Sequence, residues 1–229
     1  MKNYQTETFI EKSKDVKIAK GMSAWIHGKH MSGKTILAID LLKNLYLQYE
    51  EIYCSENLLD IETYVSMKKV KKVRNLDVSS VLHTLIKKQK QFLIDNPTKQ
   101  HNENVLFVID DLELDEFPIV MKMLEDAKKF RIDLIITSAL NLGDYQEQFF
   151  DCLFNPMQLM FFDDTLQNSH QYRNVRKFGG KNQFKDSSNF NELIKQYQTD
   201  RFEWICILKK KYNEKLYSYI PQQNLKKCL

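Results

Sequence analysis

Short runs rich in apolar residues predict β-strands in the first 162 residues. A buried strand is predicted over residues 22–27, central strands over 105–109 and 133–137, further strands over 52–54 and 157–162, and a small strand over 70–73. The run 105–109, VLFVI, contains no polar residue. A continuous apolar run of this length is typical of a central parallel strand that is covered on both faces.

Between these runs, apolar residues recur every three to four positions, which predicts amphipathic helices. The predicted helices cover residues 35–49, 60–67, 78–94 and 117–130. Asp77 or Ser79 is a suitable N-cap for the third of them, since either side chain can accept a bond from the first helical turn. Strands that alternate with helices indicate right-handed βαβ units. We therefore predict an α/β fold with a mostly parallel central sheet flanked by helices.

The two ends of the chain depart from this alternation. Residues 1–20 are polar and predict a loose arm or an edge hairpin ahead of a core over 21–162. Residues 163–191 are rich in Asn, Gln and Ser, which predicts a long loop or lid, and a short helix follows near 192–197. Residues 202–208 and 215–220 alternate apolar with polar and predict a closing β-hairpin. Because neither a repeat nor a clear boundary separates residues 163–229 from the core, we expect them to extend the same domain.

Composition narrows the class of protein. A chain of 229 residues with 43% hydrophobic and 28% charged residues is typical of soluble globular proteins. No apolar run approaches the roughly 20 residues of a membrane span, and the polar N-terminus does not resemble a signal peptide, so we expect a protein that is not secreted. Four widely spaced cysteines predict free thiols. The net charge of +4 permits contact with a polyanion without demonstrating it.

The turn after the first apolar run carries the most specific motif in the chain. It matches G-x-x-x-x-G-K-[ST] in full, with Gly28, Lys29, His30, Met31, Ser32, Gly33, Lys34 and Thr35. In such a loop the backbone N–H groups surround a triphosphate, Lys34 reaches its β- and γ-phosphates, and the Thr35 hydroxyl binds magnesium. The sequence therefore predicts a site for ATP and Mg²⁺. Lys29 and His30 either contact phosphate or face solvent.

Two consecutive acids follow the most apolar run. Asp110 is predicted to hold magnesium at the tip of a strand beside the P-loop strand, and Asp111 is a candidate base for the attacking water. The alternative is that both acids only cap the next helix. The separation of Lys34 from Asp110 leaves room for a strand and a crossover between the two motifs. This spacing is typical of RecA-like ATPases, and it favours water over a small metabolite as the phosphoryl acceptor.

The strand predicted over residues 133–137 also ends in polar residues. In such sheets this strand tip faces the γ-phosphate. Ser138 and Asn141 are therefore candidates to orient the attacking water, and the alternative is that they are turn residues only.

The order of these motifs resembles the viral genome-packaging ATPases of the FtsK–HerA superfamily, and in particular the poxvirus-type enzymes of large DNA viruses and virophages. The resemblance covers about residues 20–165 and rests on the runs GKHMSGKT, NVLFVIDDLE, KKFRIDLIITSALN and NPMQLMFF. It implies an ATP-hydrolysing core in which Lys34 and Thr35 bind phosphate and magnesium. In the same way it implies that Asp110 holds the metal and that Asp111 is the catalytic acid.

The resemblance also implies partners and a place of action. Members of this superfamily assemble as homo-oligomeric rings that move double-stranded DNA into a preformed capsid, at capsid or portal-like vertex components. That implies a location in the host cytoplasm, in a viral factory, or in the virion. Asn155 matches the asparagine before the last core strand, whereas Ala139 replaces a glutamine common in the family. In a ring, an arginine from one subunit reaches its neighbour's γ-phosphate, and the candidates are Arg131, Arg173 and Arg176.

Three functions therefore fit the sequence. The first is an ATP-driven DNA translocase for viral packaging. The second is an ATP-dependent switch that binds DNA or a partner with little turnover. The third is a P-loop nucleoside kinase that uses residues 163–191 as an acceptor lid. The Asp110–Asp111 pair favours the first function over the third.

Overall fold

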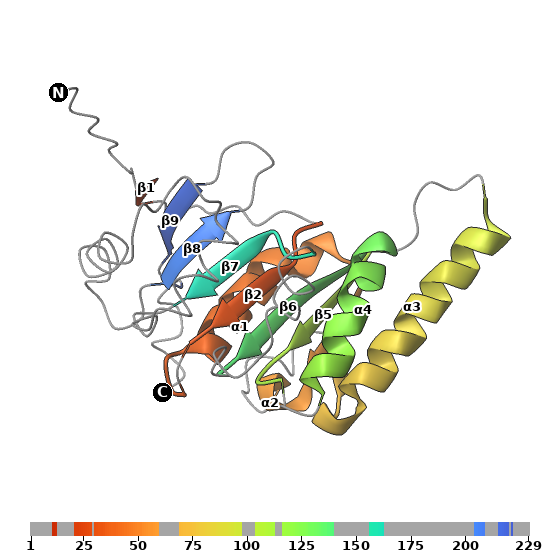
Figure 1. Cartoon of the computed structure of the whole chain (residues 1–229), viewed down its shortest axis with the longest axis horizontal. Coiled ribbons are helices and arrows are strands. Elements are labelled where there is room, and N and C mark those ends of the chain that lie inside the picture. Colours follow the sequence, from red (N-terminus) through yellow and green to blue (C-terminus); the bar gives the residue numbers. More distant parts are fainter. Residues whose placement is uncertain are drawn as a thin grey trace.

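One sheet with helices on both faces forms the described part of the chain (Figure 1). The computed structural model describes residues 11–12, 21–28, 30–59, 69–97, 104–112, 116–139, 156–162, 204–208, 215–219 and 221. The helices predicted over 60–67 and 192–197 and the loop over 163–191 lie outside these residues. None of the described helices is both long enough and apolar enough to span a bilayer.

Nine strands make up the sheet in the order β1-β9-β8-β7-β2-β6-β5-β3-β4. Their bounds are β1 Glu11–Lys12, β2 Ala24–His27, β3 Glu51–Ser55, β4 Val70–Val73, β5 Val105–Ile109, β6 Ile132–Ser138, β7 Leu159–Phe162, β8 Trp204–Leu208 and β9 Lys215–Tyr219. The six strands from β7 to β4 are parallel, whereas β8 runs antiparallel to both β7 and β9. The predicted α/β class, the parallel sheet and the C-terminal hairpin are all confirmed.

The helices also follow the sequence pattern. They are α1 Lys34–Leu45, extended by the 3₁₀ turn η1 Tyr46–Gln48, α2 Glu56–Leu59, the 3₁₀ turn η3 Asn75–Asp77, α3 Val78–Asp95 and α4 Phe117–Lys129. The helix α2 was not predicted, because four residues are too few to show a helical period. Gly33 precedes α1 with φ at 91°, a left-handed conformation that suits glycine.

The predicted N-cap of α3 needs a correction. Asp77 occupies the N-cap position, but its side chain makes no capping hydrogen bond. Arg74 Nε instead donates to Asp77 Oδ2 at 2.7 Å. The backbone N–H of Ser79 donates to Glu116 Oε2 at 3.1 Å, so a carboxylate next to α4 satisfies the start of α3. A charged neighbour outside the helix thus replaces the local cap that the sequence indicated.

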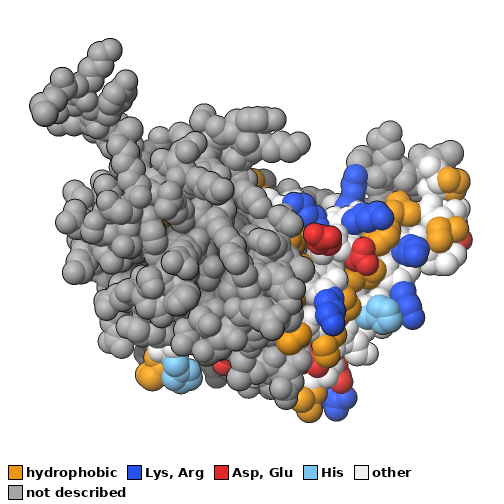
Figure 2. Space-filling view, in the orientation of Figure 1, with side chains coloured by type: hydrophobic (Ala, Val, Ile, Leu, Met, Phe, Trp, Pro, Cys, Tyr) orange, Lys and Arg blue, Asp and Glu red, His pale blue; other side chains and the backbone are white. Residues whose placement is uncertain are grey.

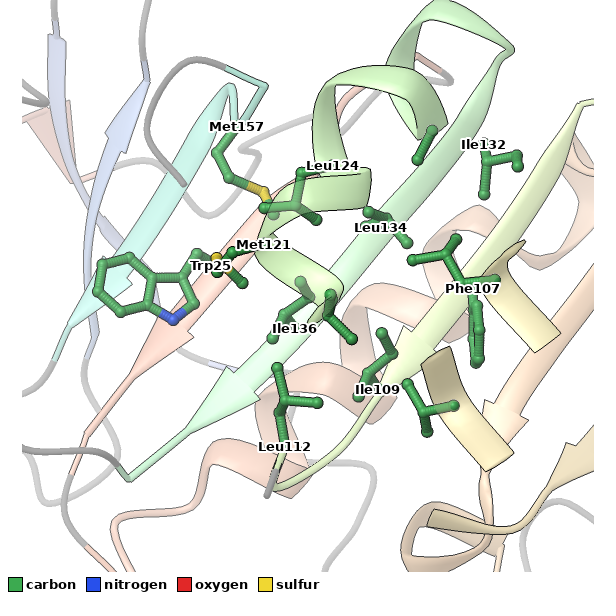
Figure 3. Close-up of a cluster of buried hydrophobic side chains, with 14 of the residues drawn as sticks. Trp25, Phe107, Ile109, Leu112, Met121, Leu124, Ile132, Leu134, Ile136 and Met157 are labelled. Carbon is green, nitrogen blue, oxygen red and sulfur yellow. The ribbon is translucent and has the colours of Figure 1, made fainter. Parts of the chain in front are cut away.

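Two hydrophobic layers cover the two faces of the sheet. Val105, Phe107 and Ile109 of β5 belong to the layer that packs against α3 and α4, and Figure 3 shows Phe107 and Ile109 with Met121 and Leu124 in this layer. The intervening residues of β5, with Ile135 of β6, belong to the layer beneath α1. This two-residue alternation decides which side chains at the strand tips face α1.

The sheet continues beyond the core on one side. Strand β1 pairs in parallel with β9, with Glu11 opposite Tyr217, so part of the predicted N-terminal arm is an edge strand. Strand β8 joins the core strand β7, with Cys206 opposite Phe161. Cys54 and Cys206 are buried free thiols, as predicted.

Candidate functional site

The glycine-rich loop lies between β2 and α1. The backbone N–H of Gly28 donates to the carbonyl of Ser138 at 3.3 Å, which fixes the start of the loop against β6. The helix then begins at Lys34, and the N–H of Leu37 donates to the Gly33 carbonyl at 3.0 Å. The N–H groups that precede this first helical bond have no partner within the helix. A helix N-terminus of this kind is a ready anion site.

Side chains of the loop fit a bound phosphate. Lys34, the lysine of the motif, is only 7% exposed. Ser32 Oγ is buried without a hydrogen-bond partner among the described residues, and such atoms are rare in folded proteins. His30 and Met31 are exposed, and Lys29 lies outside the described residues. The loop therefore retains one buried hydroxyl that a phosphate oxygen would satisfy.

Asp110 follows the last residue of β5, and three hydroxyl groups make hydrogen bonds with it. Thr35 Oγ1 donates to Asp110 Oδ2 at 2.9 Å, and Thr137 Oγ1 donates to Asp110 Oδ1 at 2.7 Å. The backbone N–H of Asp110 donates to Ser55 Oγ at 2.8 Å. Burial raises the pKa of Asp110, and the hydrogen bonds from the two threonines act in the opposite direction. The charge of Asp111 raises this pKa further, whereas that of Lys34 lowers it.

This arrangement fits a magnesium ion. The Thr35 hydroxyl and the Asp110 carboxylate are hard oxygen ligands within hydrogen-bond distance of each other. No group of three or more His, Cys, Asp or Glu side chains suited to a metal occurs in the described parts of the chain. Magnesium is commonly bound by one or two protein oxygens together with substrate phosphates and water. Thr35 and Asp110 would therefore hold the ion, and phosphate would complete the site.

The sheet order corrects one expectation. Asp110 was predicted on a strand beside the P-loop strand, but β6 lies between β2 and β5. Two strand spacings correspond to roughly 10 Å. The gap is bridged because α1 packs against β6, which brings Thr35 at its first turn to Asp110.

Asp111 has a distinct backbone conformation. Its φ is 55°, in the left-handed region that few residues other than glycine adopt. Its N–H donates to Thr137 Oγ1 at 2.7 Å, and the next N–H, of Leu112, donates to the Thr137 carbonyl at 3.2 Å. The turn after β5 is thus held against the tip of β6, and the Asp111 side chain is exposed.

The structure brings Thr137, rather than Ser138, to Asp110. Ser138 is fully buried, and its Oγ accepts a bond from Trp25 Nε1 at 3.2 Å on the face covered by α4. Thr137 follows Ile135 by two residues and therefore lies on the α1 face. Sequence reasoning named only Ser138 and Asn141 at this tip, and strict alternation along β6 would have found Thr137. Asn141 lies outside the described residues, and a sensing role for Ser138 stays a prediction.

Ser55 is a second residue that the sequence reasoning did not name. It is the last residue of β3 and is fully buried. Its polarity at the end of an apolar strand that runs parallel to β5 was the available signal.

Arg131 lies at the amino end of β6, the end opposite to the one that carries Thr137. It immediately precedes β6, is exposed, and has φ at 60°. It precedes Thr137 by six positions, which corresponds to about 20 Å along a strand. The structure therefore does not bring Arg131 to Asp110 of the same chain. Asn155, Arg173 and Arg176 lie outside the described residues.

Basic side chains are not gathered into one patch on the face seen in Figure 2. There the described Lys and Arg side chains are interspersed with acidic and apolar ones. A nucleic-acid footprint normally needs basic residues grouped on one face. The described part of this face therefore does not identify a DNA-binding surface.

Comparison with known proteins establishes the fold. No protein-family model matches the chain, and no curated protein matches its sequence. Among solved structures, it is similar to the pCW3 conjugation coupling protein TcpA in monomer form with ATPγS, with a TM-score of 0.61, 13% identity and coverage of 90% of this chain and 63% of that one. It is also similar to EssC (ATPases 2 and 3) from Geobacillus thermodenitrificans, with a TM-score of 0.55, 13% identity and coverage of 90% of this chain and 40% of that one.

A third similar structure matches along its whole length. This is the genome packaging NTPase B204 from Sulfolobus turreted icosahedral virus 2 in complex with ATPγS, with a TM-score of 0.54, 13% identity and coverage of 89% of this chain and 100% of that one. The chain thus spans less than two thirds of TcpA and of EssC. At this identity the three likenesses confirm a P-loop NTPase fold.

Proposed function

We propose that this chain is an ATP-hydrolysing motor that moves double-stranded DNA, and that it packages a viral genome into a capsid. The observation that carries the proposal is the hydrogen-bonded connection from Thr35 through Asp110 to Thr137. It joins the phosphate-binding loop to the metal-binding acid and to the tip of the intervening strand. Asp111 is the next residue and is exposed at the same edge.

Each group at this edge has a role in hydrolysis. Lys34 and the start of α1 would bind the phosphates. Thr35 and Asp110 would hold magnesium, whose positive charge would offset the negative charge of the phosphates. The exposed carboxylate of Asp111 accepts a proton from the water that attacks the γ-phosphorus, and the bond from this phosphorus to the β–γ bridging oxygen breaks, so that ADP leaves. Strand β6 lies between the P-loop strand and the Asp110 strand. This layout favours water over a nucleoside as the acceptor of the γ-phosphoryl group.

The packaging role rests on the resemblance in motif order and on the structural likeness to B204, which is described as a genome packaging NTPase. The proposed partners are double-stranded DNA and capsid or portal-like vertex components, in the host cytoplasm or the virion. The proposed assembly is a homo-oligomeric ring. Because Arg131 is remote from Asp110 of its own chain, its proposed role in catalysis is at the nucleotide of a neighbouring subunit.

The decisive experiment is phosphate release from ATP with and without long duplex DNA. We expect DNA to stimulate release by the wild type. Asp111→Asn should reduce the rate by about 10²- to 10⁴-fold, the usual contribution of a general base, while ATP still binds. Lys34→Ala should lose ATP affinity. Asp126→Asn, an exposed acid on α4, is the matched control and should leave the rate unchanged.

Other outcomes identify the alternative functions. Tight ATP binding without release, in the presence or absence of DNA, would favour a switch. The bond between Ser138 and Trp25 gives that alternative some support, because it occupies a hydroxyl proposed to sense the γ-phosphate. Product that depends on an added nucleoside would favour a kinase. Equal rates for wild type and Asp111→Asn would exclude Asp111 as the base.

A further inference from the structure

The Thr137 hydroxyl connects the two acids of the site. It donates to Asp110 Oδ1 and accepts from the Asp111 N–H, in both cases at 2.7 Å. Thr137 is fully buried at the tip of β6. Asp110 and Asp111 are neighbours in sequence, yet one is bound through its side chain and the other through its backbone.

A hydroxyl is the group that can make both contacts. It carries one hydrogen and two acceptor lone pairs. Once its hydrogen points to the Asp110 carboxylate, its lone pairs remain for the Asp111 N–H. The β-branched threonine side chain has few rotamers, which fixes the direction of both bonds. Valine has the same shape but can make neither bond.

The backbone of Asp111 gives the second contact its importance. With φ at 55°, this residue is in a conformation that an L-amino acid rarely adopts. Its N–H bond to Thr137 holds it there. The direction of the Asp111 side chain depends on this conformation, because Cβ is attached to the constrained Cα.

We propose that Thr137 is a positioning residue that fixes Asp110 for metal binding and Asp111 for proton abstraction. The inference rests on the proposed function. Thr137 is fully buried and would act through the two acids. Asp110 is held independently by Thr35 and by Ser55, so loss of Thr137 should affect Asp111 more than Asp110. The phosphate-binding loop should keep its affinity for nucleotide.

The test compares Thr137→Val with Thr137→Ser, which restores the hydroxyl but lacks the methyl group. We expect Thr137→Val to lower kcat for ATP by about 10- to 100-fold, since displacement of a reacting group by about 1 Å has effects of this size, with KM changed less than about twofold. Thr137→Ser should retain most of the rate. Thr84→Val is the matched control, because Thr84 is exposed on α3 and its Oγ1 donates only to the carbonyl of Ser80 among the contacts described.

Hydrogen exchange of the Asp111 amide supplies a readout that does not need turnover. We expect this amide to exchange at least about tenfold faster in Thr137→Val than in wild type, because its bond is lost. The Asp110 amide, bonded to Ser55, should be unchanged. The result would also hold in a wild type that releases no phosphate, so failure of the proposed function can be told from failure of this inference.

Three results would overturn the inference. The first is a Thr137→Val enzyme with wild-type kcat and unchanged exchange at Asp111. The second is a Thr137→Ser variant as impaired as Thr137→Val, which would assign the effect to the methyl group. The third is a parallel loss of nucleotide affinity, which would indicate general disruption of the site. If Thr137→Val does not fold, the Thr137→Ser data for exchange and rate still decide between hydroxyl and methyl.

Discussion

Replacement of Tyr49 by phenylalanine tests how a hydrogen bond at the amino end of β6 stabilises the fold. Tyr49 is 1% exposed, and its hydroxyl donates to Asp133 Oδ2 at 2.7 Å. Asp133 is the second residue of β6 and is 5% exposed. The backbone N–H of Gly21 donates to the same oxygen at 2.9 Å. Tyr49→Phe keeps the ring and removes one donor from a buried carboxylate.

The expected magnitude follows from that geometry. A hydrogen bond to a charged group contributes about 1.5–3 kcal/mol. Phenylalanine fills nearly the same volume, so little is added for a cavity. We expect the free energy of unfolding to fall by about 2 kcal/mol, which corresponds to a drop of roughly 4–8 °C in Tm for a chain of this size.

Urea denaturation of wild type, Tyr49→Phe and Tyr46→Phe at pH 7 measures this difference. Tyr46 is the matched control, because among the described residues its hydroxyl accepts a single long bond, of 3.4 Å, from the exposed backbone N–H of Lys69. Its replacement should lower the free energy of unfolding by less than about 0.5 kcal/mol, because phenylalanine keeps the partly buried ring and removes a hydroxyl whose described bond is long and exposed. Equal effects of the two substitutions would refute the reasoning.

The pH dependence gives a second check. Burial, and then the charge of Asp133, raise the pKa of Tyr49 well above its ordinary value of 10. Above pH 10 the unfolded chain can ionise this tyrosine and the folded chain cannot. The stability that Tyr49 contributes is therefore complete below pH 10 and is lost as the pH rises further. The gap between wild type and Tyr49→Phe should narrow above pH 10, and a constant gap up to pH 11 would contradict this account.

Two further predictions concern single side chains. The pKa of Glu51 is lowered: burial raises it, but hydrogen bonds from Lys71 and Tyr53 and the charge of Lys88 outweigh burial. Glu51→Gln should therefore reduce the free energy of unfolding, measured by urea denaturation, by about 0.5–1 kcal/mol at pH 7. This difference should disappear as the pH falls below about 4 and should be smaller in 1 M NaCl. A difference that persists at pH 3 would contradict the prediction. Burial also raises the pKa of the Cys54 thiol to about 12, so iodoacetamide at pH 8 should leave the Cys54 peptide unlabelled in the native protein and label it in urea, as read by mass spectrometry.

Much of the fold could be predicted because each buried parallel strand has a local sequence pattern, a continuous apolar run. The strand β5, with all five residues buried, is the clearest case. The order of strands is set by long-range pairing and leaves no local signal. Nothing in the sequence near Asp110 indicated that β6 would separate its strand from β2. The parallel pairing of the two-residue strand β1 with β9 was hidden for the same reason.

The sequence predicted the site residues whose roles follow from a motif position. It missed a residue whose role depends on the direction of its side chain. Thr35 and Asp110 meet as expected, because their roles are tied to motif positions. Thr137 and Ser138 are adjacent and both polar, so composition could not rank them. A shift of one residue along a strand reverses the face, and alternation from Ile135 places Thr137 on the α1 face, while Ser138 meets Trp25 on the α4 side.

Several energetically unfavourable features lie at the carboxyl ends of the parallel strands, where the proposed site is, although Arg131 has a left-handed conformation at the opposite end. At the site, Met31 and Asp111 adopt left-handed backbone conformations, and burial raises the pKa of Asp110, which disfavours its charged form. Strained backbone of this kind persists where the surrounding structure enforces it, and it is often found at functional sites. A divalent cation beside Asp110 would favour the carboxylate and reverse its penalty. We therefore interpret the site as preorganised, because bound magnesium and nucleotide would offset these unfavourable features.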